Sequence, residues 1–155
     1  MIADTDVRLA TPGDANGIAR LSRDTIEAGL AWRWTPRRVA RAIADPDTNV
    51  VVVGGPAQLE AFGIMVYRDE EAHLLLFAVR PGQRRRGIGS AVLAWLEDVA
   101  RAAGVGKIML EARRDNVAAR SFYNELGYHE RAIAHGMYGG AVDGIRLEKW
   151  LRAAE

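Results

Sequence analysis

The sequence has no cysteine and little histidine, and each shortage excludes a class of site. It contains no cysteine, which excludes disulfides, thiolate catalysis and cysteine-based zinc sites. Three histidines are present, too few for us to expect a histidine-built metal site, and we predict no metal cofactor. No apolar run approaches the ~20 residues that cross a bilayer, and the N-terminus lacks the pattern of a signal peptide. The sequence therefore predicts a cytoplasmic protein that does not contact membranes.

An excess of charge of either sign is also absent, because 21 Lys and Arg residues nearly balance 20 Asp and Glu residues. A net charge of +1 creates no overall field that would attract nucleic acid, so any electrostatic preference has to be local. The 155 residues are 49% hydrophobic and 26% charged, a composition typical of globular proteins. Together with the lack of a linker or internal repeat, these values predict a single domain over residues 1–155.

Hydrophobic periodicity predicts an α+β domain with a mixed sheet. The helix between strands 73–79 and 107–112 should be a crossover, which makes those two strands parallel. Strand 73–79 is apolar on both faces, so we expect it to be central and covered by helices. Segment 136–144 is rich in glycine and is predicted as a loop. The predicted strands are 7–10, 50–53, 61–67, 73–79, 107–112, 128–134 and 145–151. The predicted helices run from Thr11-Pro12 to Gly29, from Thr35-Pro36 to Asp45-Pro46, from Gly89 to Gly104, and from Asp115 or Asn116 to Gly127.

The segment that joins strand 73–79 to the next helix is typical of an anion site. The strand stops at Pro81, three arginines follow (Arg84, Arg85 and Arg86), and the helix then opens with Gly87-Ile88-Gly89-Ser90. Helix N-termini present free backbone N–H groups and the positive end of the helix dipole. The sequence therefore predicts that phosphates bind at this turn.

Several phosphate ligands compete for this turn. A dinucleotide fingerprint requires a third glycine where this chain has Val92, and a P-loop requires a G-K-[ST] sequence that is missing. Nucleic acid would need aromatic platforms or a wider basic face, which do not accompany the arginines. The arginine side chains are also compatible with a simple solvated charge run. A third candidate ligand, coenzyme A, comes from a resemblance to a known family.

Two linked motifs resemble those of the GNAT superfamily of N-acetyltransferases. Arg84-x-x-Gly87-x-Gly89 is similar to the [Q/R]-x-x-G-x-[G/A] loop of that family. Residues 110–128 resemble the L-E-V-R-x-x-N-x-x-A-x-x-x-Y-x-x-x-G-[FY] segment of ribosomal-protein alanine N-acetyltransferases, and the spacing of the two motifs also matches. The resemblance covers the chain from about residue 73 to its end. It implies a GNAT-like mixed, mostly antiparallel sheet of six to seven strands, with about four helices on both faces.

The resemblance implies an enzyme that transfers an acetyl group from acetyl-CoA directly to a primary amine. The amine would belong to a small molecule or to a protein N-terminus or lysine. Tyr123 would donate a proton to the departing sulfur, and Asn116 would contact pantetheine from the same helix face. The implied cofactor-binding residues are Phe77, Ala78, Val79, Arg84, Arg85, Arg86, Gly87, Ile88, Gly89, Ser90, Asn116 and Tyr123.

Two residues compete for the role of general base. Glu111 stands where the alanine N-acetyltransferases carry their proposed catalytic glutamate, and we rank it first. His73 stands where histone-acetyltransferase-like members carry a glutamate, and an imidazole exchanges a proton near neutral pH. Proton loss to water is a third route, and either side chain is also compatible with a purely structural role.

The acceptor site is predicted from aromatic residues on loops. Trp32 and Trp34 lie in the linker between the first two helices, and Tyr138 resembles a tyrosine that lines the acceptor site in that branch. The resemblance is also compatible with a homodimer formed through the last strands. A second hypothesis is a non-catalytic acetyl-CoA-binding sensor or regulatory module. A nucleic-acid-binding domain is a third hypothesis, which the charge balance disfavours.

Overall fold

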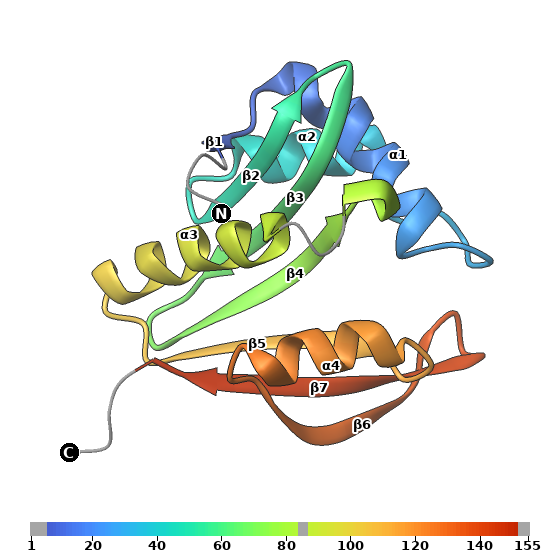
Figure 1. The fold of residues 1–155 in the computed structure, drawn as a ribbon, viewed down its shortest axis with the longest axis vertical. Helices are drawn as coiled ribbons and strands as arrows, with labels where there is room; N and C mark the ends of the chain where they lie inside the picture. Colours follow the sequence, from blue (N-terminus) through green and yellow to red (C-terminus); the bar gives the residue numbers. More distant parts are fainter. Residues whose placement is uncertain (1–5, 84–86, 152–155) are drawn as a thin grey trace.

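One mixed sheet with helices on both faces makes up the fold (Figure 1). The computed structural model describes residues 6–83 and 87–151, so the predicted phosphate contacts of Arg84, Arg85 and Arg86 lie outside the described residues. The strands are β1 (Val7–Leu9), β2 (Thr48–Gly55), β3 (Gln58–Tyr67), β4 (Glu71–Val79), β5 (Lys107–Arg113), β6 (His129–Tyr138) and β7 (Val142–Trp150). Their order in the sheet is β1-β2-β3-β4-β5-β7-β6. Neighbouring strands are antiparallel except β4 and β5, which are parallel.

Four α-helices lie within the described residues: α1 (Ala15–Thr25), α2 (Pro36–Ala44), α3 (Ile88–Ala102) and α4 (Val117–Glu125). Short 3-10 helices occupy Pro12–Asp14 and Pro81–Gln83. α3 is the crossover between β4 and β5, as its place between two strands predicted. Of the described helices, none is both long and apolar enough to cross a membrane. The predicted mixed, mostly antiparallel sheet of six to seven strands, with about four helices on both faces, is confirmed.

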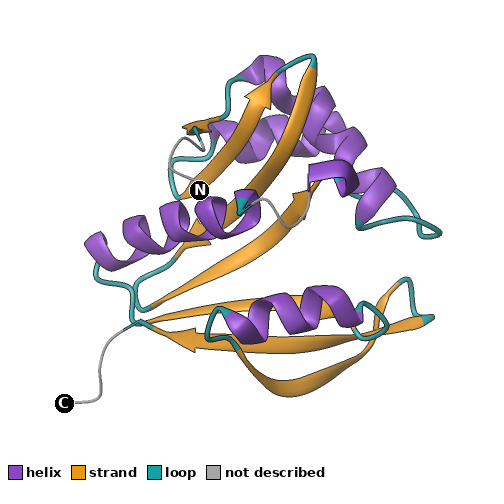
Figure 2. Ribbon diagram, viewed as in Figure 1, coloured by secondary structure: helices purple, strands orange, loops and turns teal. Residues whose placement is uncertain are grey.

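Each face of the sheet carries its own hydrophobic core. α3 and α4 lie on the near face in Figure 2, where Leu96 and Tyr128 are fully buried. α1 and α2 lie behind strands β2, β3 and β4, and there Ile18 and Val39 are fully buried. Because α1 and α2 cover only that half of the sheet, the same face of β5 and β7 carries charged side chains, including Glu111. Among these side chains, Arg113 donates to backbone carbonyls of the segment that joins α1 to α2.

A β-bulge divides β4 into two parts. Its register with β3 shifts between Ile64 and Met65, which leaves Leu75 as the extra residue. A bulge reverses the alternation of side chains, so Leu74 points into the core under α3 and α4 whereas Leu76 points into the core under α1 and α2. The central position predicted for β4 and its cover by helices on both faces are confirmed. Leu75 is 36% exposed because the bulge turns it towards an opening in the sheet.

Several predicted boundaries near glycines differ from those of the structure. α1 ends at Thr25 rather than at Gly29, since residues 26–29 form turns. The segment 136–144 is mostly strand, and the turn between β6 and β7 is limited to residues 139–141. A Cβ on Gly144 in β7 would lie 2.7 Å from the Met137 sulfur on β6, so a side chain there would have to displace Met137. Glycine at this position therefore permits close strand pairing instead of ending it.

Asp14 anchors the start of α1, and its charge links folding to pH. Its buried carboxylate accepts bonds of 2.8 and 2.9 Å from the Arg8 guanidinium and 2.8 Å from the Thr11 N–H. The Arg8 hydrogen bonds outweigh burial and hold the pKa of Asp14 below its ordinary value. We expect Asp14→Asn to lower the free energy of unfolding at pH 7 by about 2 kcal/mol, as for lost bonds to a charged group.

The sign of the pH effect follows from the lowered pKa. A carboxylate with a lowered pKa in the folded protein stabilises that state above about pH 4, and this contribution is lost as the pH falls further. Urea unfolding of the wild type and of Asp14→Asn should therefore differ most at neutral pH and converge at acidic pH. An equal difference at neutral and at acidic pH would contradict this role for the charge.

Candidate active site

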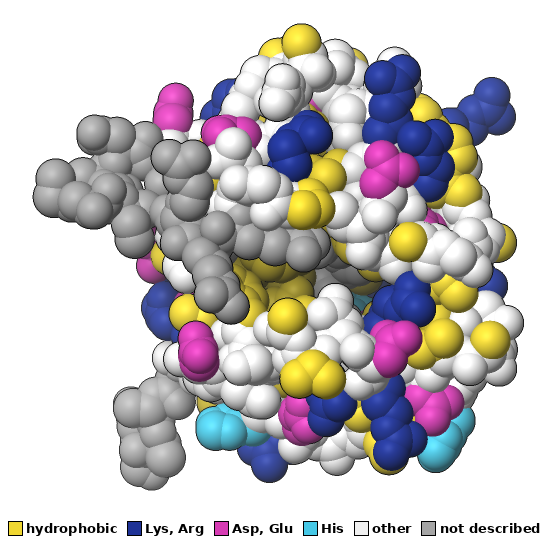
Figure 3. Space-filling view, turned by 45° about the vertical axis from the view of Figure 1, so that its right-hand side comes forward, with side chains coloured by type: hydrophobic (Ala, Val, Ile, Leu, Met, Phe, Trp, Pro, Cys, Tyr) yellow, Lys and Arg dark blue, Asp and Glu magenta, His cyan; other side chains and the backbone are white. Residues whose placement is uncertain are grey.

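The central feature of the site is a split in the sheet between β4 and β5. The parallel ladder pairs Glu71 to Leu74 with Lys107 to Leu110 and ends there. Beyond Leu74 the two strands separate, and a cleft of about 310 Å³ opens between them. Figure 3 shows a hollow in the molecule with hydrophobic side chains inside it and Lys or Arg side chains on its right-hand border. The cleft is lined by β4, β5, α4, the segment joining α1 to α2, and the end of β6.

His73 and Glu111 meet in this cleft. Both side chains extend from the face opposite Leu74 and Leu110, and the His73 Nε2 lies 2.6 Å from the Glu111 Oε1. Arg146, which pairs with Glu111 across β5 and β7, donates from Nε to the Glu111 Oε2 at 3.1 Å. The two candidates for the general base are therefore hydrogen-bonded to each other.

The Glu111 carboxylate is held as an anion. Its side chain is 6% exposed, and burial by itself would raise its pKa. The hydrogen bonds from His73 and from Arg146, together with the positive charge of Arg146, outweigh that effect, so the pKa of Glu111 is lowered. A buried carboxylate with both oxygens bonded is a weak proton acceptor, but it orients and stabilises a neighbouring cation well.

Tyr123 brings a phenol to the cleft from α4. Its ring is 6% exposed and packs against the rings of Phe77, Phe122 and Tyr128, with centroids 6.1, 5.5 and 5.9 Å away. Burial, followed by the influence of the neighbouring Tyr138, raises the pKa of Tyr123 far above its ordinary value. The phenol therefore keeps its proton at neutral pH. This burial is deeper than predicted, because the apolar stripe of α4 was expected at Ala119, Phe122 and Leu126.

Asn116 caps α4 and also lines the cleft. Its side-chain oxygen accepts a bond of 3.1 Å from the Ala119 N–H, so Asn116 rather than Asp115 is the N-cap residue. Asp115 instead accepts bonds from Arg113. The cap fixes the start of α4 beside the split, which places Asn116 and Tyr123 on one side of the cleft.

The predicted phosphate end lies where α3 begins. Gly87 adopts φ of +77° as the N-cap residue of α3, a conformation that favours glycine. A Cβ on Gly89 would lie 3.1 Å from the Phe77 ring and 3.2 Å from a Val79 methyl group. Ile88 and Gly89 are buried, and Ser90 follows in the first turn of the helix. The first turn of α3 is thus seated directly on β4, with Phe77 at the cleft and Val79 beside Gly89.

The two predicted acceptor tryptophans have different surroundings. Trp34 lines the cleft, and the Arg38 guanidinium lies 3.9 Å from the centre of its ring. Trp32 does not line the cleft, because its indole N–H donates to the Ala19 carbonyl of α1 at 3.2 Å. Tyr138 also lines the cleft, and burial, together with the negative charge of Glu111, raises its pKa to about 12.

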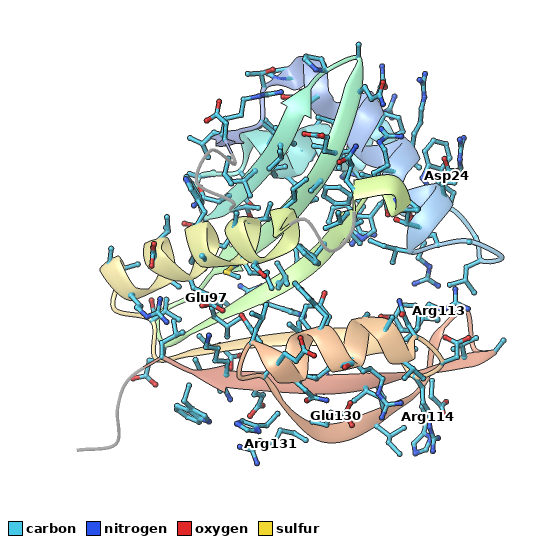
Figure 4. The ribbon with its side chains drawn as sticks, in the orientation of Figure 1. Asp24, Glu97, Arg113, Arg114, Glu130 and Arg131 are labelled. Carbon is cyan, nitrogen blue, oxygen red and sulfur yellow. The ribbon has the colours of Figure 1, made fainter. Side chains whose placement is uncertain are left out.

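Glu27 was not predicted from the sequence, and it holds the segment that joins α1 to α2 beside the cleft. Its buried carboxylate accepts the backbone N–H of Arg33 at 2.7 Å and of Trp34 at 3.2 Å, and the Ser22 hydroxyl at 2.8 Å. Arg113 adds a second tie from the end of β5, where it donates to the Ala28 carbonyl at 3.1 Å (Figure 4). Two of the partners of Glu27 are backbone N–H groups, which any residue has, so these contacts leave no sequence motif. The sequence shows no more at this position than an acidic residue beside apolar ones.

Removing the Glu27 carboxylate should destabilise the segment that joins α1 to α2. We expect Glu27→Ala to lower the free energy of unfolding by about 2 kcal/mol, because the bonded N–H and O–H groups lose a charged acceptor. Glu27→Gln should cost less, since one amide oxygen can still accept both N–H groups while the Ser22 hydroxyl turns to accept. Urea unfolding of the two variants measures this difference, and equal losses would contradict the hydrogen-bonding role.

No group of three or more His, Asp or Glu side chains that could hold a metal ion occurs in the part of the chain that the structure describes. The chemistry available in the cleft is instead an imidazole held against a carboxylate, with a protonated phenol on the other side. Those are the elements of proton transfer.

Comparison with known proteins agrees with this arrangement. Residues 21–128 match the model of the acetyltransferase (GNAT) family. The chain belongs to this family. The resemblance predicted from the loop at Gly87 and from residues 110–128 is thereby confirmed.

Individual members of the GNAT family are similar to this chain over different lengths. Ribosomal protein bS18-alanine N-acetyltransferase of Escherichia coli (strain K12) is 37% identical over 81 residues, which are 52% of this chain and 55% of that protein. The chain thus spans about half the length of the curated relatives that it matches in this group. N-alpha-acetyltransferase RimI of Mycobacterium tuberculosis (strain H37Rv) is 29% identical over 147 residues, 89% of each chain. A crystal structure of the ribosomal-protein-S18-alanine N-acetyltransferase from Escherichia coli superposes with a TM-score of 0.79, at 25% identity, over 98% of this chain and 97% of that chain.

Proposed function

We propose that this protein is an acetyl-CoA-dependent N-acetyltransferase that transfers an acetyl group directly to a primary amine. One observation carries this proposal: the split between β4 and β5 brings His73, Glu111 and the Tyr123 phenol into one cleft. Membership of the GNAT family supports it, as do the names of the relatives, which are N-acetyltransferases.

The residues around the split fit coenzyme A. The edge of β4 beyond Leu74 no longer pairs with β5, so backbone groups near Phe77 and Ala78 are available to an extended pantetheine chain. α3 is the first α-helix after β4 in the chain. The N-terminus of a helix as long as α3 attracts phosphate. We assign the pyrophosphate to Gly87, Gly89 and Ser90, and the pantetheine to Phe77, Ala78, Val79 and Asn116. The arginines 84–86 are expected to contribute charge.

We assign proton acceptance to His73 and give Glu111 a positioning role. An ionised carboxylate can only accept hydrogen bonds, so the His73 Nε2 carries the proton that is shared with the Glu111 Oε1. The His73 Nδ1 is then the nitrogen that accepts a proton from the attacking amine. This ranking reverses the one based on the sequence, because the Glu111 carboxylate is engaged by both His73 and Arg146.

Tyr123 completes the reaction as the proton donor. The amine nitrogen forms a bond to the acetyl carbon, the carbon–sulfur bond breaks, and the Tyr123 hydroxyl gives its proton to the departing sulfur. The Tyr123 phenol lines the cleft and is protonated at neutral pH, so it can donate its proton as negative charge develops on the sulfur.

A ligand titration followed by a turnover assay tests the proposal. Acetyl-CoA and CoA should raise the melting temperature, with about 2.7 kcal/mol of stabilisation at a hundredfold excess over Kd, whereas NAD should have no effect. Thiol release should then appear when acetyl-CoA is mixed with a panel of peptides and small amines. Stabilisation by NAD alone would contradict the proposal, and tight acetyl-CoA binding without release on any amine would favour a regulatory module.

Three further expectations stay predictions. The protein should be cytoplasmic, should not bind nucleic acid, and is compatible with a homodimer through its last strands. Light scattering at several concentrations measures the oligomeric state.

A further inference from the structure

Some of the charged side chains that line the acceptor side of the cleft have hydrogen-bond or ion-pair partners among residues 6–83 and 87–151, and others do not. The proposal drawn from this difference rests on the proposed transferase function. Two carboxylates line the cleft, and both are already bonded. Glu27 accepts from two backbone N–H groups and from Ser22, while Glu111 accepts from His73 and Arg146. Neither carboxylate is therefore free to receive a cationic group of an acceptor.

The arginines that line the cleft are less fully paired than the two carboxylates. Three arginines line the cleft, and Arg113 is paired with Asp115 at 3.2 Å and with the Ala28 carbonyl. Arg33 and Arg38 are exposed, and within the described residues no carboxylate lies within 4.0 Å of either guanidinium. The unsatisfied charge on the acceptor side of the cleft is therefore positive.

Arg38 is also held in place. Its guanidinium lies 3.9 Å from the centre of the Trp34 ring, a cation–π contact that restricts its side chain. The backbone of Arg33 and Trp34 is fixed in turn by Glu27, with N–H to Oε1 distances of 2.7 and 3.2 Å. A planar guanidinium held on an aromatic ring presents its N–H donors as a fork that matches a carboxylate. Pre-ordering of this kind lowers the entropy cost of binding.

We infer that the acceptor is a primary amine that carries a carboxylate close to the amino group, and that Arg38 and Arg33 bind this carboxylate. A peptide N-terminus followed by Asp or Glu has this chemistry, and so does a small acidic amino acid. A polyamine or a peptide with Lys at its first positions would add positive charge to a wall that offers it no free carboxylate. The expected acceptors are therefore anionic primary amines.

A matched peptide series tests the inference in two independent ways. The probes are peptides with one N-terminal residue, alanine, and with three Glu, three Gln or three Lys at the next positions. Free aspartate and glutamate are the small-molecule arm, and spermidine is the cationic arm. Acetyl transfer is measured as kcat/KM for each amine, and binding is measured by anisotropy of the same peptides labelled at the C-terminus, with CoA present.

We expect the Glu peptide to exceed the Gln peptide, and the Gln peptide to exceed the Lys peptide. Arg38→Gln and Arg33→Gln should each lower kcat/KM and affinity for the Glu peptide by about fivefold, the upper range for an exposed ion pair. The double variant should remove the preference for Glu while leaving the KM for acetyl-CoA unchanged. Arg41→Gln is the matched control, because Arg41 is exposed on the same helix and does not line the cleft.

The outcomes separate the inference from the proposed function. Equal or better use of the Lys peptide, an unchanged preference in the double variant, or a change confined to the KM for acetyl-CoA would each overturn the inference. Binding of the Glu peptide that depends on Arg33 and Arg38, without turnover of any amine, would uphold the anion site and contradict the transferase. Turnover of free aspartate or glutamate but not of the Glu peptide would assign the site to small amino acids.

Discussion

Replacing Tyr123 with phenylalanine should lower kcat by about 10²- to 10⁴-fold, the range for loss of a general acid. The substitution removes the hydroxyl and keeps the ring, whose centroid lies 6.1 Å from that of Phe77 and 5.5 Å from that of Phe122. Because burial keeps the phenol protonated at neutral pH, the lost group is a proton donor and not a charge. The departing thiolate would then have to take its proton from water. Steady-state kinetics with a good acceptor measures the effect.

Two controls separate loss of the acid from damage to the fold. Acetyl-CoA should bind Tyr123→Phe with unchanged Kd, since the aromatic packing is preserved. Tyr67→Phe removes a hydroxyl that accepts from the Asn49 amide at 3.2 Å and lies outside the cleft, and its turnover should match the wild type. Full turnover by Tyr123→Phe would show that the sulfur receives its proton from another source.

Much of the fold was predictable because its signals are local. The apolar period of α3 and the strands on either side of it predicted the parallel pair β4 and β5, and this pair is confirmed. The glycines of 136–144 misled the prediction, because Gly144 pairs with Ala134 in the β6–β7 ladder and Gly136 lies at a register shift within β6, while residues 139–141 make the turn. The bulge at Leu75 was also invisible, since it depends on the register with β3 and not on the residues of β4 alone.

The site was predictable as a set of residues but not as an arrangement. His73 and Glu111 were proposed as rivals, and the parallel register of β4 and β5 makes them partners at 2.6 Å. Arg146 was not considered, because its contact with Glu111 depends on the pairing of β5 with β7. Trp32 and Trp34 looked equivalent in the sequence, yet Glu27 and Arg38 hold the second one at the cleft. Each of these features is a contact between distant segments, which a local pattern does not contain.

Two matched substitutions should distinguish His73 as the proton acceptor from Glu111 as the positioning residue. His73→Asn should lower kcat/KM by about 10²- to 10³-fold, as expected when the general base is removed. Glu111→Gln should lower it by about ten- to a hundredfold, the value of one hydrogen bond to a charged group. The fold should survive Glu111→Gln, because the Arg146 side chain is 43% exposed and can be hydrated.

The relative size of the two losses distinguishes a positioning residue from a base. The His73 Nε2 lies 2.6 Å from the Glu111 Oε1, so Glu111→Gln weakens the orientation of the ring but leaves the ring in place. If Glu111 were the base, Glu111→Gln would be the more damaging of the two substitutions. A larger loss of kcat/KM in His73→Asn than in Glu111→Gln, with unchanged binding of acetyl-CoA in both variants, therefore assigns the proton to His73 and its orientation to Glu111.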